Sequence, residues 1–249
     1  MPKPEIKYYS LFEKFPELVH GFSTRIGGVS QAPFTSLNLG ASTPDDAERV
    51  RENRRLFFKA LNIPQERIVF PRQVHSANIR IVNHPGIIAA CDALITAQND
   101  LFLSIQTADC FPVFLFDPNQ RVVAIVHSGW RGTAKNIVGK TIRQMIAHFA
   151  VQPAHILAVI GPGVQKSCYQ VDETVVLHFD AEFYRQDGPA HYLLDLQGAI
   201  HRQMTDAGIR GEHIEVDLEC THCRSDLYYS YRRDGKQSGR MMGIIGLRG

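Results

Sequence analysis

Short, almost unbroken apolar runs dominate the middle of the chain. Three of them predict β-strands at 101–106, 112–116 and 121–126. Because strands that are apolar on both faces need cover on both faces, these three should lie inside the fold. Shorter apolar runs predict further strands, at 67–70, 78–82, 155–160, 214–218, 227–232 and 241–247.

Amphipathic stretches alternate with the strands and predict helices. Thr43 is expected to cap the first helix, because Pro44 and two acidic residues after it suit a first helical turn. A second helix is expected from Thr133 to Phe149, and others at 172–180 and 193–207. The pattern predicts an α+β fold in a single domain spanning 1–249, without repeats or linkers.

Composition and charge limit the possible partners. The chain has 249 residues, of which 44% are hydrophobic and 21% charged, which is typical of a soluble globular protein. A formal net charge of +2 gives no reason to expect a nucleic-acid or membrane partner. The N-terminal residues lack a signal-peptide core, and no apolar stretch is long enough to span a bilayer. We expect a cytoplasmic protein, as a monomer or small homo-oligomer.

The five cysteines are an odd number scattered through a long chain, which does not suit a disulfide framework. They are expected to be reduced, so that at least one is free to act as a ligand or nucleophile. The segment Cys220-Thr221-His222-Cys223 offers half a zinc knuckle, which is a weak signal. It also lacks the proline and spacing of the zinc deaminase motif, so we assign it no role.

The most informative segment is TADCFPVFLFDPNQRVVAIVHSGWRGT, residues 107–133, which predicts a β-hairpin. A turn centred between Pro118 and Asn119 pairs residues whose numbers sum to 237, so that Cys110 lies opposite His127. Paired side chains share a face about 5 Å apart. That separation suits two metal ligands or a thiolate–imidazole pair, and a bulge near Pro112 would change the register.

The loop between the predicted strands at 67–70 and 78–82 contains His75. Two histidines and one cysteine would leave a tetrahedral zinc with one position open to water, the pattern of a catalytic site. His75 is one of 11 histidines, and the residue pattern alone does not select it.

Several polar loops have the composition of binding sites. The turn after His127 is rich in glycine and contains Arg131, a planar donor for phosphate or carboxylate. The loops around Arg25 and Asn38 are polar and rich in glycine. Residues 228–233 interleave tyrosines with arginines, including Arg232. This pattern favours a strand with a solvated basic face over a base-stacking surface.

Several motifs together resemble a known family. HGFSTRIGGVS, SLNLG, QVHSANI, CDALIT, TADCFPVFLFD, HSGWRGT, IGPGV and YSYRRDGKQSGR occur in that family's order, from about His20 to the C-terminus. The chain resembles the YfiH or laccase-domain family (DUF152), also called the multicopper polyphenol oxidase family and now regarded as zinc-dependent purine nucleoside phosphorylases. The resemblance implies mixed β-sheets packed as a sandwich with helices on the outside.

The resemblance also implies a site. Its motifs place zinc on His75, Cys110 and His127, which would then be the catalytic residues. They make Arg25, Asn38, Arg131 and Arg232 candidate substrate-binding residues. The implied reactions are phosphorolysis of adenosine, inosine, guanosine and S-methyl-5'-thioadenosine, with hydrolytic deamination of adenosine in the same pocket. Purine nucleosides and phosphate are therefore the expected partners.

Three other functions remain open. One is copper-dependent phenol oxidation with Cu²⁺, although a multicopper site needs many more histidines than this pattern offers. The second is a cysteine hydrolase with Cys110 as nucleophile and His127 as base. The third is a nucleotide sensor or zinc store without turnover.

Overall fold

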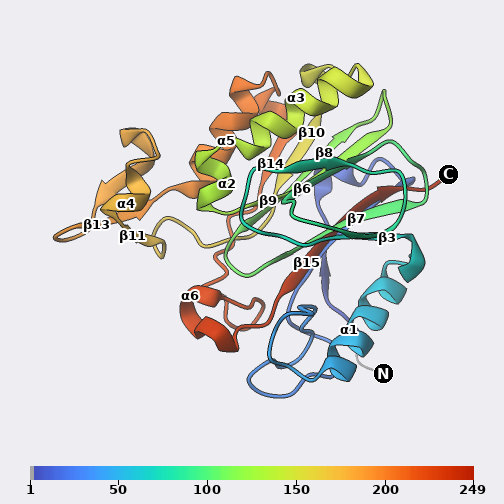
Figure 1. The fold of residues 1–249 in the computed structure, drawn as a ribbon, viewed down its shortest axis with the longest axis horizontal. Helices are drawn as coiled ribbons and strands as arrows, with labels where there is room; N and C mark the ends of the chain where they lie inside the picture. Colours follow the sequence, from blue (N-terminus) through green and yellow to red (C-terminus); the bar gives the residue numbers. More distant parts are fainter. Residues whose placement is uncertain (1–2) are drawn as a thin grey trace.

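The computed structural model describes residues 3–249, in which two six-stranded sheets stack face to face (Figure 1). The first sheet consists of β1 (Ile6–Lys7), β2 (Leu18–Ser23), β15 (Met241–Leu247), β7 (Leu101–Thr107), β3 (Ile68–Pro71) and β5 (Gly86–Ile88), in that spatial order. The second consists of β14 (Ile214–Val216), β10 (Leu157–Ile160), β8 (Phe111–Asp117), β9 (Val122–Ser128), β6 (Ala93–Thr96) and β4 (Ile79–Ile81). Each sheet contains parallel and antiparallel pairs, so both are mixed, as predicted.

The helices lie outside the sandwich, also as predicted. They are α1 (Ala47–Ala60), α2 (Trp130–Ala134), α3 (Ile137–Phe149), α4 (Glu173–Val176), α5 (Leu196–Asp206) and α6 (Tyr231–Asp234). Short 3₁₀ turns occur at Ser10–Phe12, Gln65–Arg67, Pro153–His155, Ala181–Phe183, Gly211–His213 and Gly235–Gln237. In Figure 1, α2, α3 and α5 cover the second sheet and α1 covers the first. None of the helices described is both long and apolar enough to cross a membrane.

A small sheet stands to one side of the sandwich (Figure 1). It consists of β11 (Gln170–Asp172), β13 (His191–Leu194) and β12 (Tyr184–Gln186), with α4 packed beside it. The chain enters it from the end of β10 and leaves it for α5. The segment before β11 therefore links the sandwich to the small sheet.

The apolar strands have cover on both faces, as expected. In β8, Phe111, Val113 and Leu115 pack toward α3 and α5, whereas Phe114 and Phe116 pack between the two sheets. All five are fully buried. The apolar run at 111–116 thus reflects two hydrophobic layers that meet at one strand.

The predicted register of the hairpin is wrong by two residues. β8 pairs Phe111 with Ser128 and Asp117 with Val122, so paired numbers sum to 239 instead of 237. The turn consists of residues 118–121, between the end of β8 at Asp117 and the start of β9 at Val122. The Asp117 carboxylate stabilises it by accepting the N–H groups of Asn119 and Gln120. Arg121 then closes the turn in the left-handed region, at φ +53°.

Helix boundaries also differ from the prediction. The first helix begins at Ala47 and is capped by Asp46, which accepts the N–H of Glu48 at 2.8 Å, whereas Thr43 donates to the carbonyl of Gly40. The helix predicted from residue 133 is two helices, α2 and α3. Asn136 separates them with left-handed backbone angles and caps α3 through its side chain.

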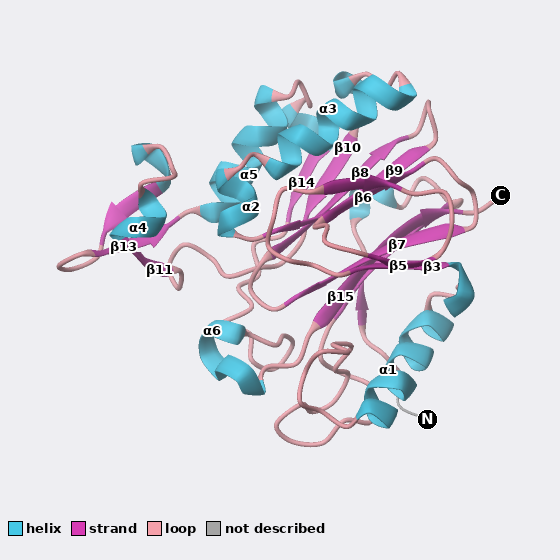
Figure 2. Cartoon of the chain, in the orientation of Figure 1, coloured by secondary structure: helices cyan, strands magenta, loops and turns pink. Residues whose placement is uncertain are grey.

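The C-terminal third contains the largest error. The segment predicted as a strand at 227–232 passes from two fully buried tyrosines, Tyr228 and Tyr229, into α6 (Figure 2). Ser230 caps that helix by accepting the N–H of Arg233, and serine at this position favours a helix start. The helices predicted at 172–180 and 193–207 are also shorter, because β13 takes 193–194 and α4 has four residues.

Candidate metal centre

Three side chains that are far apart in the sequence meet at one end of the sandwich. His75 lies in the loop after β3, Cys110 in the loop between β7 and β8, and His127 near the end of β9. Their potential ligand atoms all lie within 4.8 Å of one another, and the two imidazole rings have centroids 4.8 Å apart. His127 is buried and His75 is exposed, so the group is open to solvent on one side.

The proximity of Cys110 and His127 survives the register error. Pro112 pairs directly with His127, and side chains two residues apart on a strand share a face. A shift of two residues therefore leaves Cys110 on the same face as His127. The position opposite Cys110 is taken by Gly129, where a Cβ atom would lie 2.8 Å from the Cys110 sulfur. The glycine of the HSGWRG segment leaves room for the thiol.

Asp92 holds two of the three side chains in place, and sequence reasoning missed it. His127 Nδ1 donates to Asp92 Oδ1 at 2.8 Å, which directs Nε2 of the imidazole toward Cys110 and His75. The carboxylate also accepts the backbone N–H groups of His75 and Ser76 at 3.0 and 2.7 Å. Such a carboxylate behind a ligating histidine is common in metal sites. In the sequence, Asp92 is marked only as a single acidic residue before the apolar run ALIT.

The charges of these residues are strongly coupled. Burial alone would raise the pKa of Cys110, but the charge of His127 and hydrogen bonds from both imidazoles outweigh it and lower this pKa to about 6. Burial opposes charge on His127 too, yet Cys110 and Asp92 raise its pKa to about 9. Against its own burial, Asp92 has a pKa of about 2 because of His127 and Ser76. The opposite shifts of these two pKa values favour a thiolate on Cys110 beside a protonated His127.

The donor set fits a zinc ion. One thiolate and two imidazoles are ligands that zinc prefers, and three protein ligands leave a fourth position for water or substrate. The open side at His75 gives that position access to solvent. This arrangement of side chains is chemically suited to hold a metal ion.

Asp109, next to Cys110, ties the centre to the C-terminal segment. One carboxylate oxygen accepts the hydroxyl of Thr221 at 2.7 Å, and the other accepts the backbone N–H of Arg232 at 2.7 Å. Asp109 itself is buried and has a left-handed backbone, at φ +85°. The turn that presents the thiol is thus held by residues more than a hundred positions away.

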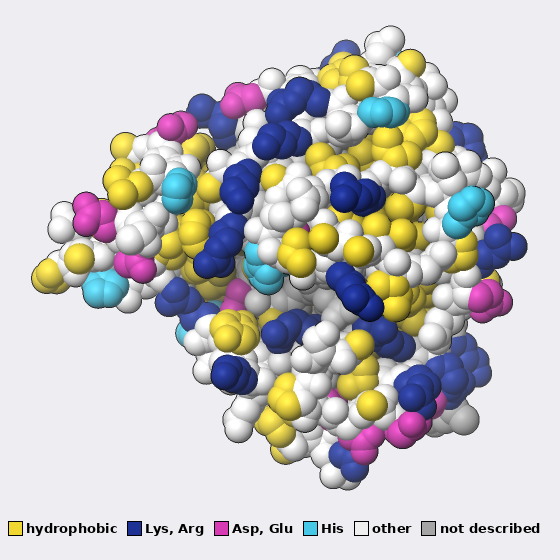
Figure 3. All heavy atoms as spheres, in the orientation of Figure 1, with side chains coloured by type: hydrophobic (Ala, Val, Ile, Leu, Met, Phe, Trp, Pro, Cys, Tyr) yellow, Lys and Arg dark blue, Asp and Glu magenta, His cyan; other side chains and the backbone are white. Residues whose placement is uncertain are grey.

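Two of the predicted substrate residues lie near this centre. Burial raises the pKa of Tyr169, the charges of Cys110 and Asp109 raise it further, and Arg232 and Arg131 oppose them. The charges of these four residues therefore act on one tyrosine, which sequence reasoning did not single out. Both arginines are exposed. Figure 3 shows Lys and Arg side chains gathered around a hollow between α2, the small sheet and α6.

The other two predicted substrate residues bind parts of the protein itself. Asn38 is fully buried, and its amide donates to Thr43 and Asp45 and accepts the N–H groups of Gly40 and Arg240. Arg25 donates to the carbonyls of Thr35 and Ser225, and its guanidinium lies 4.7 Å from the ring centroid of Tyr229.

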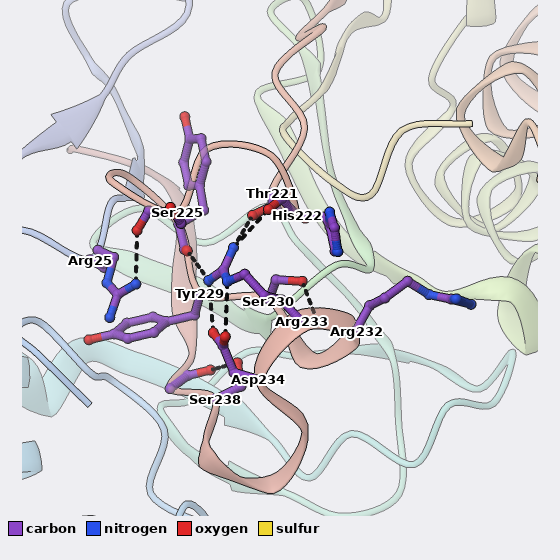
Figure 4. A network of polar contacts seen from close by, with 12 residues as sticks. Arg25, Thr221, His222, Ser225, Tyr229, Ser230, Arg232, Arg233, Asp234 and Ser238 are labelled. Atoms are coloured by element: carbon purple, nitrogen blue, oxygen red, sulfur yellow. Dashed lines mark hydrogen bonds and ion pairs between the residues drawn. The ribbon is translucent and has the colours of Figure 1, made fainter. Parts of the chain in front are cut away.

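In the contacts around α6 (Figure 4), Arg25 stands beside Tyr229, while the Arg232 side chain extends in the opposite direction. Arg232 also donates to the carbonyl of Gln170 and lies over the ring of Tyr169. Arg25 therefore contacts nearby loops and Tyr229. The Arg232 side chain lies on the side of Tyr169, and its backbone N–H binds Asp109 beside Cys110.

Comparison with known proteins identifies the family of this chain. A family model described as multi-copper polyphenol oxidoreductase laccase matches residues 19–248. The purine nucleoside phosphorylase YlmD of Bacillus subtilis is 34% identical over 93% of this chain and 89% of its own. A purine nucleoside phosphorylase of Deinococcus radiodurans is 38% identical over 92% and 88%.

Solved structures of similar proteins have the same fold. The crystal structure of YlmD from Geobacillus stearothermophilus has a TM-score of 0.91 and 35% identity, covering 95% of this chain and 94% of that one. The Bacillus licheniformis hypothetical protein YfiH has a TM-score of 0.92 and 32% identity, covering 100% and 97%. The chain therefore belongs to the multi-copper polyphenol oxidoreductase laccase family, as its motifs predicted.

Proposed function

We propose that this protein is a zinc-dependent purine nucleoside phosphorylase whose metal ligands are His75, Cys110 and His127. The convergence of one thiol and two imidazoles on one point carries the proposal, because that set suits a zinc ion with a free position. The names of the relatives support the reaction. Adenosine, inosine, guanosine and S-methyl-5'-thioadenosine are the proposed substrates, with deamination of adenosine as a second reaction. The free thiols suit the cytoplasm.

The chain's own residues prepare the centre for its metal. Asp92 fixes the tautomer and orientation of His127, and Gly129 leaves space for the sulfur of Cys110. When bound, zinc would supply Lewis-acid chemistry to an oxygen of water or substrate. Deamination also needs a group that relays protons. Both carboxylate oxygens of Asp109 already accept donors within the protein, so we assign the relay to a water molecule and not to Asp109.

Phosphorolysis also requires an anion beside the ribose. Phosphate must approach the anomeric carbon as positive charge develops there, so fixed cations near the metal centre would hold it in place. Arg131 and Arg232 are exposed and act on the same tyrosine as Cys110. Guanidinium groups bind phosphate through two parallel hydrogen bonds. We assign phosphate to these two arginines and give Arg25 and Asn38 the supporting role of shaping the adjacent loops.

The test is to incubate zinc-loaded protein with adenosine in the presence and absence of phosphate, and to separate the products by chromatography. We expect adenine and ribose 1-phosphate only when phosphate is present, and inosine in both cases. Tight nucleoside binding without either product would instead indicate a sensor. Turnover that persists after chelation, with a covalent adduct on Cys110, would indicate the cysteine hydrolase.

The family description also raises copper-dependent oxidation. Within residues 3–249, the His/Cys/acidic groups that could hold a metal form two clusters, and only one contains histidine. That is far from the many imidazoles of a multicopper site. Metal analysis after copper-free expression, followed by assays with a phenol and with adenosine, separates the two functions.

A further inference from the structure

Three further cysteines converge away from the proposed catalytic cluster. Cys168 lies in the segment before β11, while Cys220 and Cys223 lie in the loop after β14. Their sulfur atoms all lie within 4.8 Å of one another, and those of Cys168 and Cys223 are 3.3 Å apart. Because Cys168 is 52 residues from Cys220 in sequence, the spacing of cysteines gave no sign of the trio. The Cys220–Cys223 pair, to which sequence analysis assigned no role, thus has a third thiol, that of Cys168, beside it.

The protein backbone prepares this thiol triangle. The N–H of Gln165 donates to the sulfur of Cys220 at 3.4 Å, and the N–H of Cys168 donates to the carbonyl of Gln165. Backbone N–H groups directed at a cysteine sulfur stabilise its thiolate form. The turn that carries Cys168 is thus docked against the loop that carries Cys220.

Arg233 fixes the other side of the triangle. Its guanidinium donates to the carbonyls of Thr221 and His222, the two residues between Cys220 and Cys223 (Figure 4). It also pairs with Asp234. Contacts of Arg233 with the backbone therefore support the C-x-x-C loop in addition to the contact that the Cys220 sulfur makes.

We propose that Cys168, Cys220 and Cys223 bind a second zinc ion. Sulfurs at the corners of a zinc tetrahedron are about 3.8 Å apart when each Zn–S bond is about 2.3 Å. Here one pair is 3.3 Å apart and all three pairs lie within 4.8 Å, a range that includes that spacing. Thiolates are the softest protein ligands, and three of them select zinc over magnesium or calcium. A C-x-x-C pair is a usual half of such a site. Cys223 is exposed, so water completes the shell.

The second ion has a structural role. It joins the segment before β11 to the loop after β14, two segments that also meet through the N–H of Thr221 and the carbonyl of Gly163. Thr221 in turn donates to Asp109, beside Cys110. Tyr169, next to Cys168, lies against Arg232, whose backbone N–H donates to Asp109. The ion therefore holds a wall of the catalytic site, and this inference does not depend on which reaction that site performs.

Zinc content of the folded, zinc-loaded protein after removal of weakly bound metal tests the proposal. We expect two ions per chain in the unaltered protein and one in Cys223→Ser, in which the remaining ion stays at His75, Cys110 and His127. Cys168→Ser should also contain one zinc ion. The agreement of the two variants would show that the loss of zinc is not peculiar to one substitution. Cys110→Ala should also retain one ion, and Cys110→Ala/Cys223→Ser none. Cys91→Ala, at a buried cysteine outside both clusters, is the matched control and should keep two.

Cobalt gives a readout that does not involve activity. In Cys110→Ala, Co²⁺ can bind only the thiol triangle, so an intense thiolate-to-cobalt charge-transfer band should appear and should vanish in Cys110→Ala/Cys223→Ser. Thermal unfolding of Cys223→Ser should become insensitive to the second equivalent of zinc. One zinc per chain that is lost entirely in Cys110→Ala would overturn the proposal. So would a Cys168–Cys223 disulfide in protein kept under reducing conditions.

Discussion

Asp92 and His127 are joined by a buried hydrogen bond of 2.8 Å between Oδ1 and Nδ1, and both side chains are almost inaccessible to solvent. The same carboxylate accepts the backbone N–H of His75. A single acid therefore orients one proposed ligand through its ring and another through its main chain. This arrangement makes Asp92 a positioning residue.

Asp92→Asn should weaken zinc binding by about 10–100-fold, the usual effect of removing a hydrogen-bond partner of a ligating histidine. Competition with a chelator measures the affinity. Asp117→Asn is the control, because Asp117 is equally buried but caps the turn between β8 and β9. It should lower stability without changing zinc affinity. Equal affinities in Asp92→Asn and the unaltered protein would remove Asp92 from the site.

Gly129→Ala should disturb the metal centre through space alone. A Cβ atom at this position would lie 2.8 Å from the sulfur of Cys110 and 3.6 Å from the His75 ring. Overpacking of this kind costs about 1–3 kcal/mol, so zinc affinity should fall by about tenfold or more. Gly211→Ala has no atom within 4 Å of the new methyl group and is the control. Isothermal titration with zinc measures both, and no difference between them would contradict the geometry.

Arg131→Gln should raise the KM for phosphate and leave the KM for adenosine nearly unchanged. A hydrogen bond to a charged group contributes about 1.5–3 kcal/mol, which corresponds to about 10–100-fold in KM. Arg143→Gln removes an exposed guanidinium on α3 and is the matched control. Initial rates at varied phosphate give the values. A rise in the KM for adenosine alone would place Arg131 at the nucleoside.

His20 should make stability depend on pH outside the catalytic site. It lies on β2, almost buried against Phe12, and its Nε2 accepts the N–H of Tyr9. Burial lowers the pKa of His20 from 6.5 to about 4. Between these values the unfolded chain binds a proton that the folded chain does not, so the free energy of unfolding falls as the pH falls through this window. Above pH 6.5 both states are neutral and the effect is absent.

The full effect is at most about 3 kcal/mol. Urea unfolding of the unaltered protein and of His20→Gln, compared from pH 6.5 down to about 4, isolates it because the other histidines contribute equally to both. The variant should lose less stability across the window. Parallel pH profiles for the two proteins would show that His20 has the same pKa in the folded and unfolded chains.

The sandwich was predictable because its signal is local. Residues 111–117 and 122–128 are apolar at every position or nearly so, and a strand with cover on both faces needs that composition. The hairpin also predicted that Cys110 and His127 lie on the same face. That prediction holds despite the wrong register, because a shift of two residues leaves each side chain on its face.

The remaining features depend on contacts between distant segments. Asp92 forms hydrogen bonds with residues 16–35 positions away in the sequence. Cys168 and Cys223, whose sulfurs are in contact, are 55 positions apart. No periodicity encodes such contacts. The prediction of a strand at 227–232 was wrong. It rested on the strand propensity of Tyr228 and Tyr229, but tertiary packing, which buries both side chains, overrides that local propensity. His75 was selected only by the family motif.

The most direct measurement compares zinc content and phosphate-dependent adenine release in the same preparations of three proteins: unaltered, Cys110→Ala and Cys91→Ala. Cys91 is fully buried but lies outside the cluster. We expect Cys91→Ala to match the unaltered protein, and Cys110→Ala to lose adenine release together with one zinc ion. Cys110→Ala that folds, binds as much zinc as the unaltered protein and still converts adenosine to adenine would contradict the metal centre and the function built on it.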